Sequence, residues 1–96
     1  MSARPALRSV LRLRLYVAGN APNSVRAVAN VRALCEEHFR GRHAIEIVDL
    51  LTEPQKALAD SIIVTPTLLK LAPLPVQRVI GNLSDTASVL VMLNGR

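Results

Sequence analysis

Three side chains that lie close together in this sequence could carry thiol or metal chemistry. Cys35 and His38 are three residues apart, and His43 follows shortly after Gly41. A structural zinc ion takes four ligands, and a catalytic zinc takes three with an open position. Because the chain offers only these soft ligands, we expect no metal site and no cofactor. We interpret Cys35 as a buried small hydrophobic residue.

Carboxylates are the second group that could do chemistry, because a paired acid and base can transfer protons. Most of them fall at expected helix ends or exposed helix positions, where carboxylates serve as caps and aid solubility. The glycines stand too far apart for a phosphate-binding loop. The sequence therefore predicts a protein that is not an enzyme and that acts by binding another protein. The residues weighed are Glu36, Glu37, Asp49, Glu53, Asp60, Asp85, Gly19, Gly41, Gly81 and Gly95.

The chain is basic, with 12 Lys and Arg against 7 Asp and Glu and a net charge of +5. Arginines dominate the stretch before the first acidic residue, Glu36, and such an excess favours an acidic partner surface. We expect no nucleic acid, because Tyr16 and Phe39 are the only aromatic residues and stacking on single strands needs more.

Hydrophobic spacing in the first half predicts a strand, a helix and a second strand. Alternation indicates a strand over residues 11–17, and spacings of three and four indicate an amphipathic helix over 25–39 that Asn23 or Ser24 caps. A mostly apolar run over 44–51 is typical of a strand covered on both faces. We expect a single domain over residues 1–96, with 1–9 as a disordered basic leader. No apolar run is long enough for a membrane span, so we expect a cytoplasmic protein with no membrane partner.

The second half predicts a short helix, a hairpin and a last helix. A capping box of Thr52 and Gln55 should begin a helix over 55–60. Strands over 67–71 and 76–80 flank a proline-rich connection, as an antiparallel hairpin would. Ser84 should cap a last helix that ends near Gly95. The resulting order, βαβαββα, is that of the α/β thioredoxin-like fold.

Five stretches together form a specific pattern that resembles the KaiB family of circadian clock proteins. They are LYVAGN at 15–20, PNSVRA at 22–27, IVDL at 47–50, TPTL at 65–68 and VIGNLS at 79–84. The resemblance runs from Leu11 to Leu93. It implies an adaptor that docks on the ATPase ring of a KaiC-type protein and competes with a histidine kinase that bears a similar domain. A KaiA-like protein is a further partner of this kind.

The resemblance also implies the residues that bind the partner. The family's basic positions match here at Lys70 and Arg78, whereas a neighbouring arginine is replaced by Gln77. Arg26 lies in the matched stretch of the first helix and is added as a candidate. We expect binding through the β-hairpin half and the first helix, with Lys70, Arg78 and Arg26 exposed to meet an acidic surface.

A change of fold is the third implication of the resemblance. Family members rest as a tetramer whose C-terminal half folds differently, and they bind KaiC in the thioredoxin-like form. We take Pro66, Met92 and Asn94 as fold-switch positions, with Met92 and Asn94 replacing the family's Gly and Asp. These replacements, and the missing acidic tail after Arg96, favour a thioredoxin-like monomer. The resting fold, as a dimer or tetramer, stays open as an alternative.

Thiol–disulfide exchange by this fold needs a thiolate at the turn after the first strand. Here that turn reads AGNA over residues 18–21, so we expect no reductase activity. Two rival functions stay open. One is a thioredoxin-like sensor module that binds a histidine kinase without KaiC, and the other is a basic domain that binds a nucleic-acid backbone.

Overall fold

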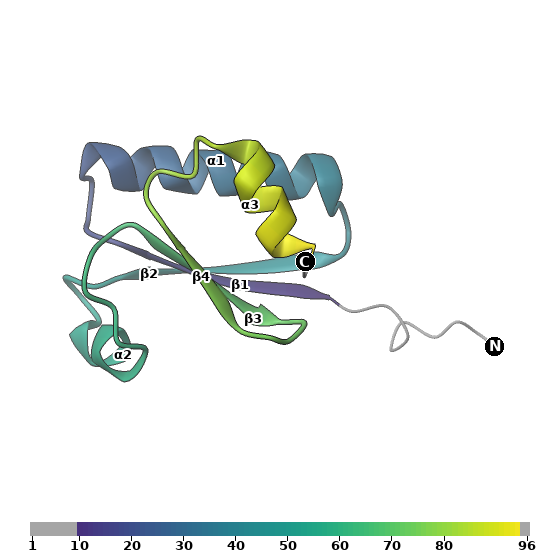
Figure 1. The fold of residues 1–96 in the computed structure, drawn as a ribbon. Helices are drawn as coiled ribbons and strands as arrows, with labels where there is room; N and C mark the ends of the chain where they lie inside the picture. Colours follow the sequence, from purple (N-terminus) through teal and green to yellow (C-terminus); the bar gives the residue numbers. More distant parts are fainter. Residues whose placement is uncertain (1–9, 95–96) are drawn as a thin grey trace.

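The structure is a computed structural model that describes residues 10–94, so the expected leader lies outside the described residues. Its helices and strands follow one another in the predicted order (Figure 1). The elements are β1 (Leu11–Val17), α1 (Pro22–His38), β2 (His43–Asp49), α2 (Pro54–Ala59), β3 (Thr67–Ala72), β4 (Gln77–Ile80) and α3 (Thr86–Leu93).

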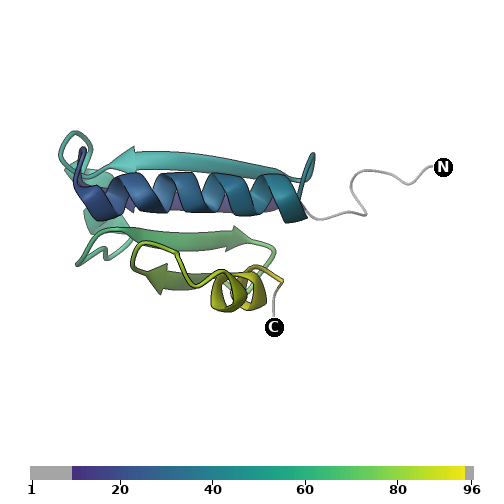
Figure 2. The same ribbon diagram turned by 90° about the horizontal axis from the view of Figure 1, so that it is seen from above.

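The strands form one sheet in the order β2-β1-β3-β4. β1 and β2 are parallel, and the β1–β3 and β3–β4 pairs are antiparallel. The parallel pair follows from α1, because parallel neighbours need a crossover connection. α1 and α3 cover one face of the sheet, and α2 lies against the other (Figures 1 and 2). None of the helices within residues 10–94 is long and apolar enough to cross a membrane.

β1 lies inside the sheet and contributes to a hydrophobic core on each face. Leu11, Leu13 and Leu15 belong to the larger core, which lies beneath α1 and α3. Tyr16 points to the opposite face and joins Val48, Ala57 and Leu69 in a smaller core beside α2. The predicted alternation along residues 11–17 is therefore confirmed, and its second face is buried at Tyr16 as well.

The predicted first-helix caps are wrong. α1 begins at Pro22, and Ala21 is the N-cap with no side-chain hydrogen bond. Proline suits the first turn of a helix because its missing N–H would have no partner there. Ser24 therefore lies inside the helix, where its buried Oγ accepts a hydrogen bond from the Ala18 N–H at 3.0 Å.

The other two predicted caps are also wrong. α2 begins at Pro54 behind Glu53, and no capping box forms. The Thr52 hydroxyl instead donates to the Asp49 carbonyl oxygen at 3.1 Å. At α3 the cap is Asp85 and not Ser84, because an Asp85 carboxylate oxygen accepts from the Ser88 N–H at 3.2 Å.

β2 was expected to be covered on both faces, and it is covered only in part. Ile45 and Ile47 pack against the larger core, and Val48 belongs to the smaller core on the other face. β2 is an edge strand, and within it only Val48 is buried. An apolar run alone does not reveal position in the sheet. The central positions go to β1 and β3 because the antiparallel hairpin adds to the free side of β1.

Candidate functional site

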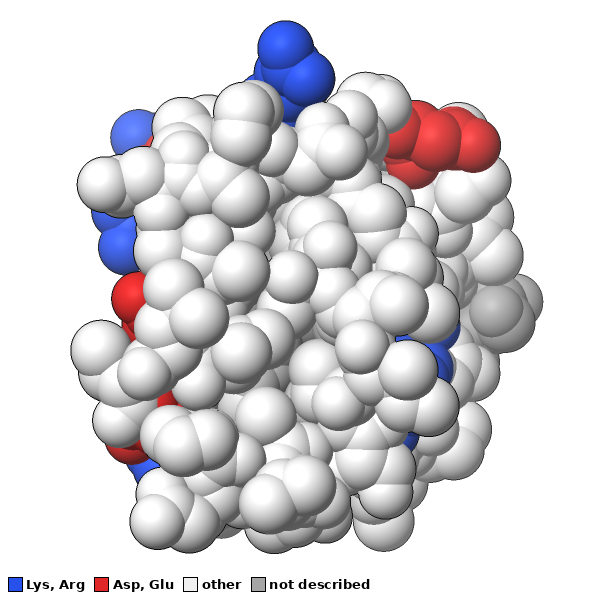
Figure 3. Space-filling model, turned by 90° about the vertical axis from the view of Figure 1, so that its left-hand side faces the viewer, with Lys and Arg blue, Asp and Glu red and all other residues white. Residues whose placement is uncertain are grey.

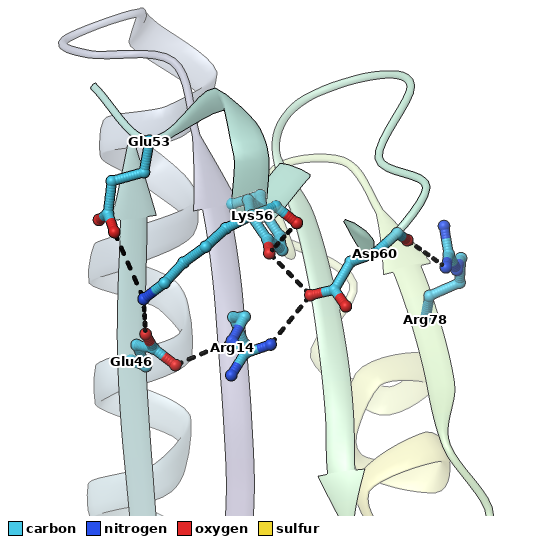
Figure 4. Close-up of polar contacts among 7 residues, drawn as sticks. Arg14, Glu46, Glu53, Lys56, Asp60 and Arg78 are labelled. Carbon is cyan, nitrogen blue, oxygen red and sulfur yellow. Dashed lines mark hydrogen bonds and ion pairs between the residues drawn. The ribbon is translucent and has the colours of Figure 1, made fainter. Parts of the chain in front are cut away.

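An ion-pair network joins β1, β2 and α2 on the α2 face of the sheet (Figure 4). Arg14 lies between two carboxylates, with Nε 2.8 Å from Glu46 Oε1 and Nη1 2.9 Å from Asp60 Oδ2. Lys56 Nζ lies 2.9 Å from Glu46 Oε2 and 3.3 Å from Glu53 Oε1. The network combines two cations with three carboxylates and ties α2 to the two parallel strands.

Tyr16 completes the network from below α2. Its hydroxyl lies 2.7 Å from Asp60 Oδ2 and 2.8 Å from the Lys56 carbonyl oxygen, and it donates to one of these acceptors. Burial, followed by the hydrogen bond to Asp60, raises the pKa of Tyr16 to about 12. The hydrogen bond from Tyr16, with help from Arg14, lowers the pKa of Asp60. Hydrogen bonds from Arg14 and Lys56 lower the pKa of Glu46.

These shifts hold the network in a single protonation state at neutral pH. The two carboxylates stay ionised and the phenol stays protonated, so none of the three groups exchanges a proton easily near pH 7. The network therefore holds α2 against the sheet through ionised carboxylates and a protonated phenol.

Arg78 extends this network from β4. Its Nη2 donates to the Asp60 carbonyl oxygen at 3.0 Å, and its Nη1 donates to the Ser61 carbonyl oxygen at 3.2 Å. These are backbone acceptors just beyond the last turn of α2, where helix carbonyls lack partners. Arg78 is exposed, as predicted for a partner-binding residue, but its guanidinium is already engaged within the molecule.

Lys70 differs from expectation, because it is buried and not exposed. Its fractional exposure is 0%. Lys70 pairs with Leu13 of β1 and with Gln77 of β4, which places it on the face that α1 and α3 cover. The prediction of an exposed Lys70 is therefore wrong for this conformation. Gln77 is partly buried on the same face.

The predicted partner-binding residues do not form one surface. Arg78 pairs with Leu69 and lies on the α2 face, whereas Lys70 and Gln77 lie on the opposite face. Arg26 is exposed on α1, with Nη1 3.3 Å from Asn23 Oδ1.

The predicted fold-switch residues lie in or beside the packed core. Met92 is buried among the larger core residues beneath α3. Asn94 caps α3, and its N–H donates to the Leu90 carbonyl oxygen at 2.9 Å. Pro66 is buried, and its carbonyl oxygen accepts from the Gly81 N–H at 3.0 Å.

Cys35 is fully buried on α1, as predicted. Burial raises the pKa of its thiol to about 11, which disfavours the reactive thiolate. His43 Nδ1 lies 2.8 Å from the Phe39 carbonyl oxygen. Among residues 10–94, no three His, Cys, Asp or Glu side chains come together as metal ligands would.

One end of the sheet forms an uncharged surface that the sequence analysis missed. β1, β2 and β4 end there and β3 begins there, so the loops 18–21, 50–52, 61–66 and 81–84 meet at one end (Figure 1). These loops contain no Lys, Arg, Asp or Glu, and the face seen from this side is almost free of charge (Figure 3). We call it the uncharged end. The exposed hydrophobic residues on it are Leu51, Ile63, Val64 and Ile80.

The family model and the similar sequences all carry the same family name. Residues 14–94 match the KaiB domain. The circadian clock oscillator protein KaiB of Prochlorococcus marinus is 52% identical over 82 residues, which cover 85% of this chain and 69% of that protein. The protein of the same description from Synechococcus elongatus is 51% identical over 82 residues, which cover 85% of this chain and 80% of that protein.

Solved structures show the same fold. The N-terminal domain of Synechococcus elongatus SasA is 26% identical with a TM-score of 0.66, and the match covers 95% of this chain and 88% of that chain. A chloroplastic thioredoxin z is 19% identical with a TM-score of 0.72, covering 95% and 84%. The predicted thioredoxin-like fold is confirmed. Because the family match spans nearly all the described residues, and about half of the aligned residues are identical to named KaiB proteins, this chain belongs to the KaiB family.

Proposed function

We propose that this protein is a clock protein that docks on the ATPase ring of a KaiC-type protein and catalyses no reaction itself. The observation that carries the proposal is the KaiB match over residues 14–94, which includes every helix and all but the first residues of β1. The burial of the Cys35 thiol agrees with a binding protein that uses no reactive thiol.

The uncharged end is the surface we assign to docking. Ile63 is 91% exposed there, Leu51 is exposed on a neighbouring loop, and Ile80 is exposed at the last position of β4. Burying one such side chain against a partner contributes about 1.5–3 kcal/mol. Exposed hydrophobic residues gathered on an uncharged surface are typical of protein–protein contacts.

Basic residues near this surface would add electrostatic attraction to an acidic partner. Arg26 lies on the first turns of α1 and Arg78 lies beside the end of α2, so both flank the uncharged end. Charges at the rim of an interface mainly change the association rate and its dependence on salt. Gln77 and Lys70 lie on the face that α1 and α3 cover, so in this conformation they would contribute less to the attraction between the protein and its partner.

Competition with a protein of similar shape follows from the same proposal. The fold shared with the N-terminal domain of SasA supports a common docking mode, in which two thioredoxin-like domains exclude each other from one ring. A KaiA-like protein would be a further partner of the docked form.

The test is binding of the purified protein to the KaiC-type ATPase of the same organism, with ATP present. We expect Ile63→Asp to raise Kd about tenfold or more, because it places a charge in an apolar contact. Leu74→Asp is the matched control, since Leu74 is 77% exposed in the β3–β4 hairpin at the opposite end of the sheet.

The outcomes test the proposed function and the proposed docking surface separately. If the unaltered protein does not bind the ring, the proposed function is wrong. If it binds and Ile63→Asp has no more effect than Leu74→Asp, the docking surface lies elsewhere. Arg26→Glu should weaken binding more at low salt than at high salt, because screening reduces the repulsion it introduces.

A further inference from the structure

The carboxylate of Asp49, the last residue of β2, joins two of the loops that form the uncharged end. Its Oδ1 accepts a hydrogen bond from the Gly19 N–H at 3.1 Å and another from the Leu51 N–H at 2.9 Å. Gly19 belongs to the loop that follows β1, and Leu51 belongs to the loop that follows β2. One carboxylate oxygen therefore sets the position of one loop relative to the other.

The main chain of Asp49 holds the rest of the second loop. Its carbonyl oxygen accepts from the Thr52 N–H at 3.0 Å and from the Thr52 hydroxyl at 3.1 Å. At the start of this loop, the Leu50 N–H donates to the Val17 carbonyl oxygen at 2.9 Å. These bonds do not use the carboxylate, so a substitution of the Asp49 side chain leaves them in place.

The Leu51 side chain lies directly over Gly19. A Cβ atom added at Gly19 would lie 3.2 Å from Leu51 Cδ1, so a larger residue there would press against the leucine. Gly19 also has a φ of +54°, a left-handed conformation that glycine adopts readily. Leu51 nonetheless stays 67% exposed, so it is available to a partner while it rests on the first loop.

A hydrophobic side chain on an ordered loop contributes more to binding than one on a mobile loop. A loop that becomes ordered only when a partner arrives loses conformational entropy in the complex, and this loss weakens binding. A loop that is already ordered avoids the loss. Asp49 is suited to order these loops, because a charged acceptor makes stronger hydrogen bonds with N–H groups than a neutral one.

We propose that Asp49 is a positioning residue that fixes Leu51 on the uncharged end before a partner binds. The inference rests on the proposed docking of the uncharged end, and it adds a residue that acts through Leu51 and not by contact with the partner. The partner surface that meets Leu51 would be apolar, because a charge buried against a leucine side chain would lose its solvation.

Amide hydrogen exchange of the free protein tests whether the carboxylate orders the two loops. We expect Asp49→Ala to speed exchange at Gly19 and Leu51 about tenfold or more, because both N–H groups lose their acceptor. Asp49→Asn should restore slower exchange at both amides, since its side-chain oxygen can accept at the same place. Asp85→Ala is the matched control, because it removes a carboxylate that accepts from an N–H of α3. It should leave exchange at Gly19 and Leu51 unchanged.

Binding to the KaiC-type ATPase, with ATP present, tests whether Asp49 acts through Leu51. Asp49→Ala and Leu51→Ala should each raise Kd by about threefold to tenfold. The double variant should bind no more weakly than Leu51→Ala alone, because a leucine that is absent needs no positioning. Asp49→Ala combined with Ile63→Ala is the control pair, since Ile63 lies in the separate loop between α2 and β3. In that pair the two losses should multiply.

Faster exchange in Asp49→Ala that Asp49→Asn restores would support the inference, and unchanged exchange at Gly19 and Leu51 would overturn it. Exchange in Asp49→Asn as fast as in Asp49→Ala would also overturn it, because the shared acceptor would then not order the loops. Losses that multiply in the Asp49 and Leu51 double variant would mean that Asp49 acts elsewhere. Failure of the unaltered protein to bind the ring would contradict the proposed function alone, because the exchange rates are measured without a partner.

Discussion

Tyr16 reports directly on the ion-pair network, because it is the only tyrosine in the chain. Its pKa is raised from 10.0 to about 12, so the folded state favours the protonated phenol. This contribution to stability is complete below pH 10 and is lost as pH rises through about 12. We expect tyrosinate absorbance to titrate near 12 in the folded protein and near 10 in denaturant. Asp60→Asn should move the folded value towards 10, because it removes a negative charge beside the phenol. A folded midpoint equal to the denatured one would contradict the described geometry.

Cys35 gives the second prediction at the scale of single residues. The thiol is buried and its pKa is raised to about 11, and the AGNA turn after β1 carries no thiol. We therefore expect no turnover in an insulin-reduction assay, with a thioredoxin run alongside as the positive control. Turnover that disappears in Cys35→Ser would show that the buried thiol is reactive after all.

At the scale of elements, Arg78 secures the end of α2. Its guanidinium donates to the carbonyl oxygens of Asp60 and Ser61, and Ser61 has a positive φ of 56°. Arg78→Ala should therefore speed amide exchange at residues 60–62 about fivefold to tenfold, the effect of losing one or two hydrogen bonds. Arg26→Ala, on the exposed side of α1, should leave these amides unchanged.

This prediction bears on how binding data for Arg78 should be interpreted. If Arg78→Ala loosens α2, weaker binding of an Arg78 variant reflects a displaced surface as well as a lost charge. Unchanged exchange at residues 60–62 would assign any binding defect to the charge alone.

For the whole molecule, we expect a monomer that rests mainly in the thioredoxin-like form. Met92 lies inside α3 and in the larger core. A straight-chain residue there favours the helix over Gly by roughly 0.5–1 kcal/mol. About 1 kcal/mol changes the ratio of two forms roughly fivefold, so this residue matters if two folds lie close in free energy. Val89 and Val91 act in the opposite direction, because β-branched residues suit a strand.

Solution NMR combined with light scattering measures this balance. Helical chemical shifts over residues 86–93 in a monomer would agree with the prediction, and Met92→Gly should raise the population of any second form. A tetramer with strand-like shifts over residues 89–93 would contradict it. If Met92→Gly leaves the population of the second form unchanged, the ratio of the two folds depends on other residues.

The amino-acid sequence by itself determined the order of elements and the absence of a thiol at the turn after β1. Alternation along residues 11–17 and the helical spacing after Val25 are local patterns, so they need no knowledge of the fold. Burial of Cys35 also followed from its place on the apolar side of that helix. The cap predictions failed because the helices begin at other residues than expected. α1 begins at Pro22, so Asn23 and Ser24 lie inside it, and α3 is capped by Asp85 instead of the neighbouring Ser84.

Tertiary structure alone decided the features that depend on pairing between distant segments. β3 is apolar on both faces, so its sequence does not indicate which way Lys70 points. Only its register with Leu13 places the lysine on the face that α1 and α3 cover. Arg14 and Asp60 are 46 residues apart and meet because α2 returns to the sheet beside β1. The uncharged end likewise joins four loops that are separate in sequence. Each of these features depends on strand order and register, which local patterns do not specify.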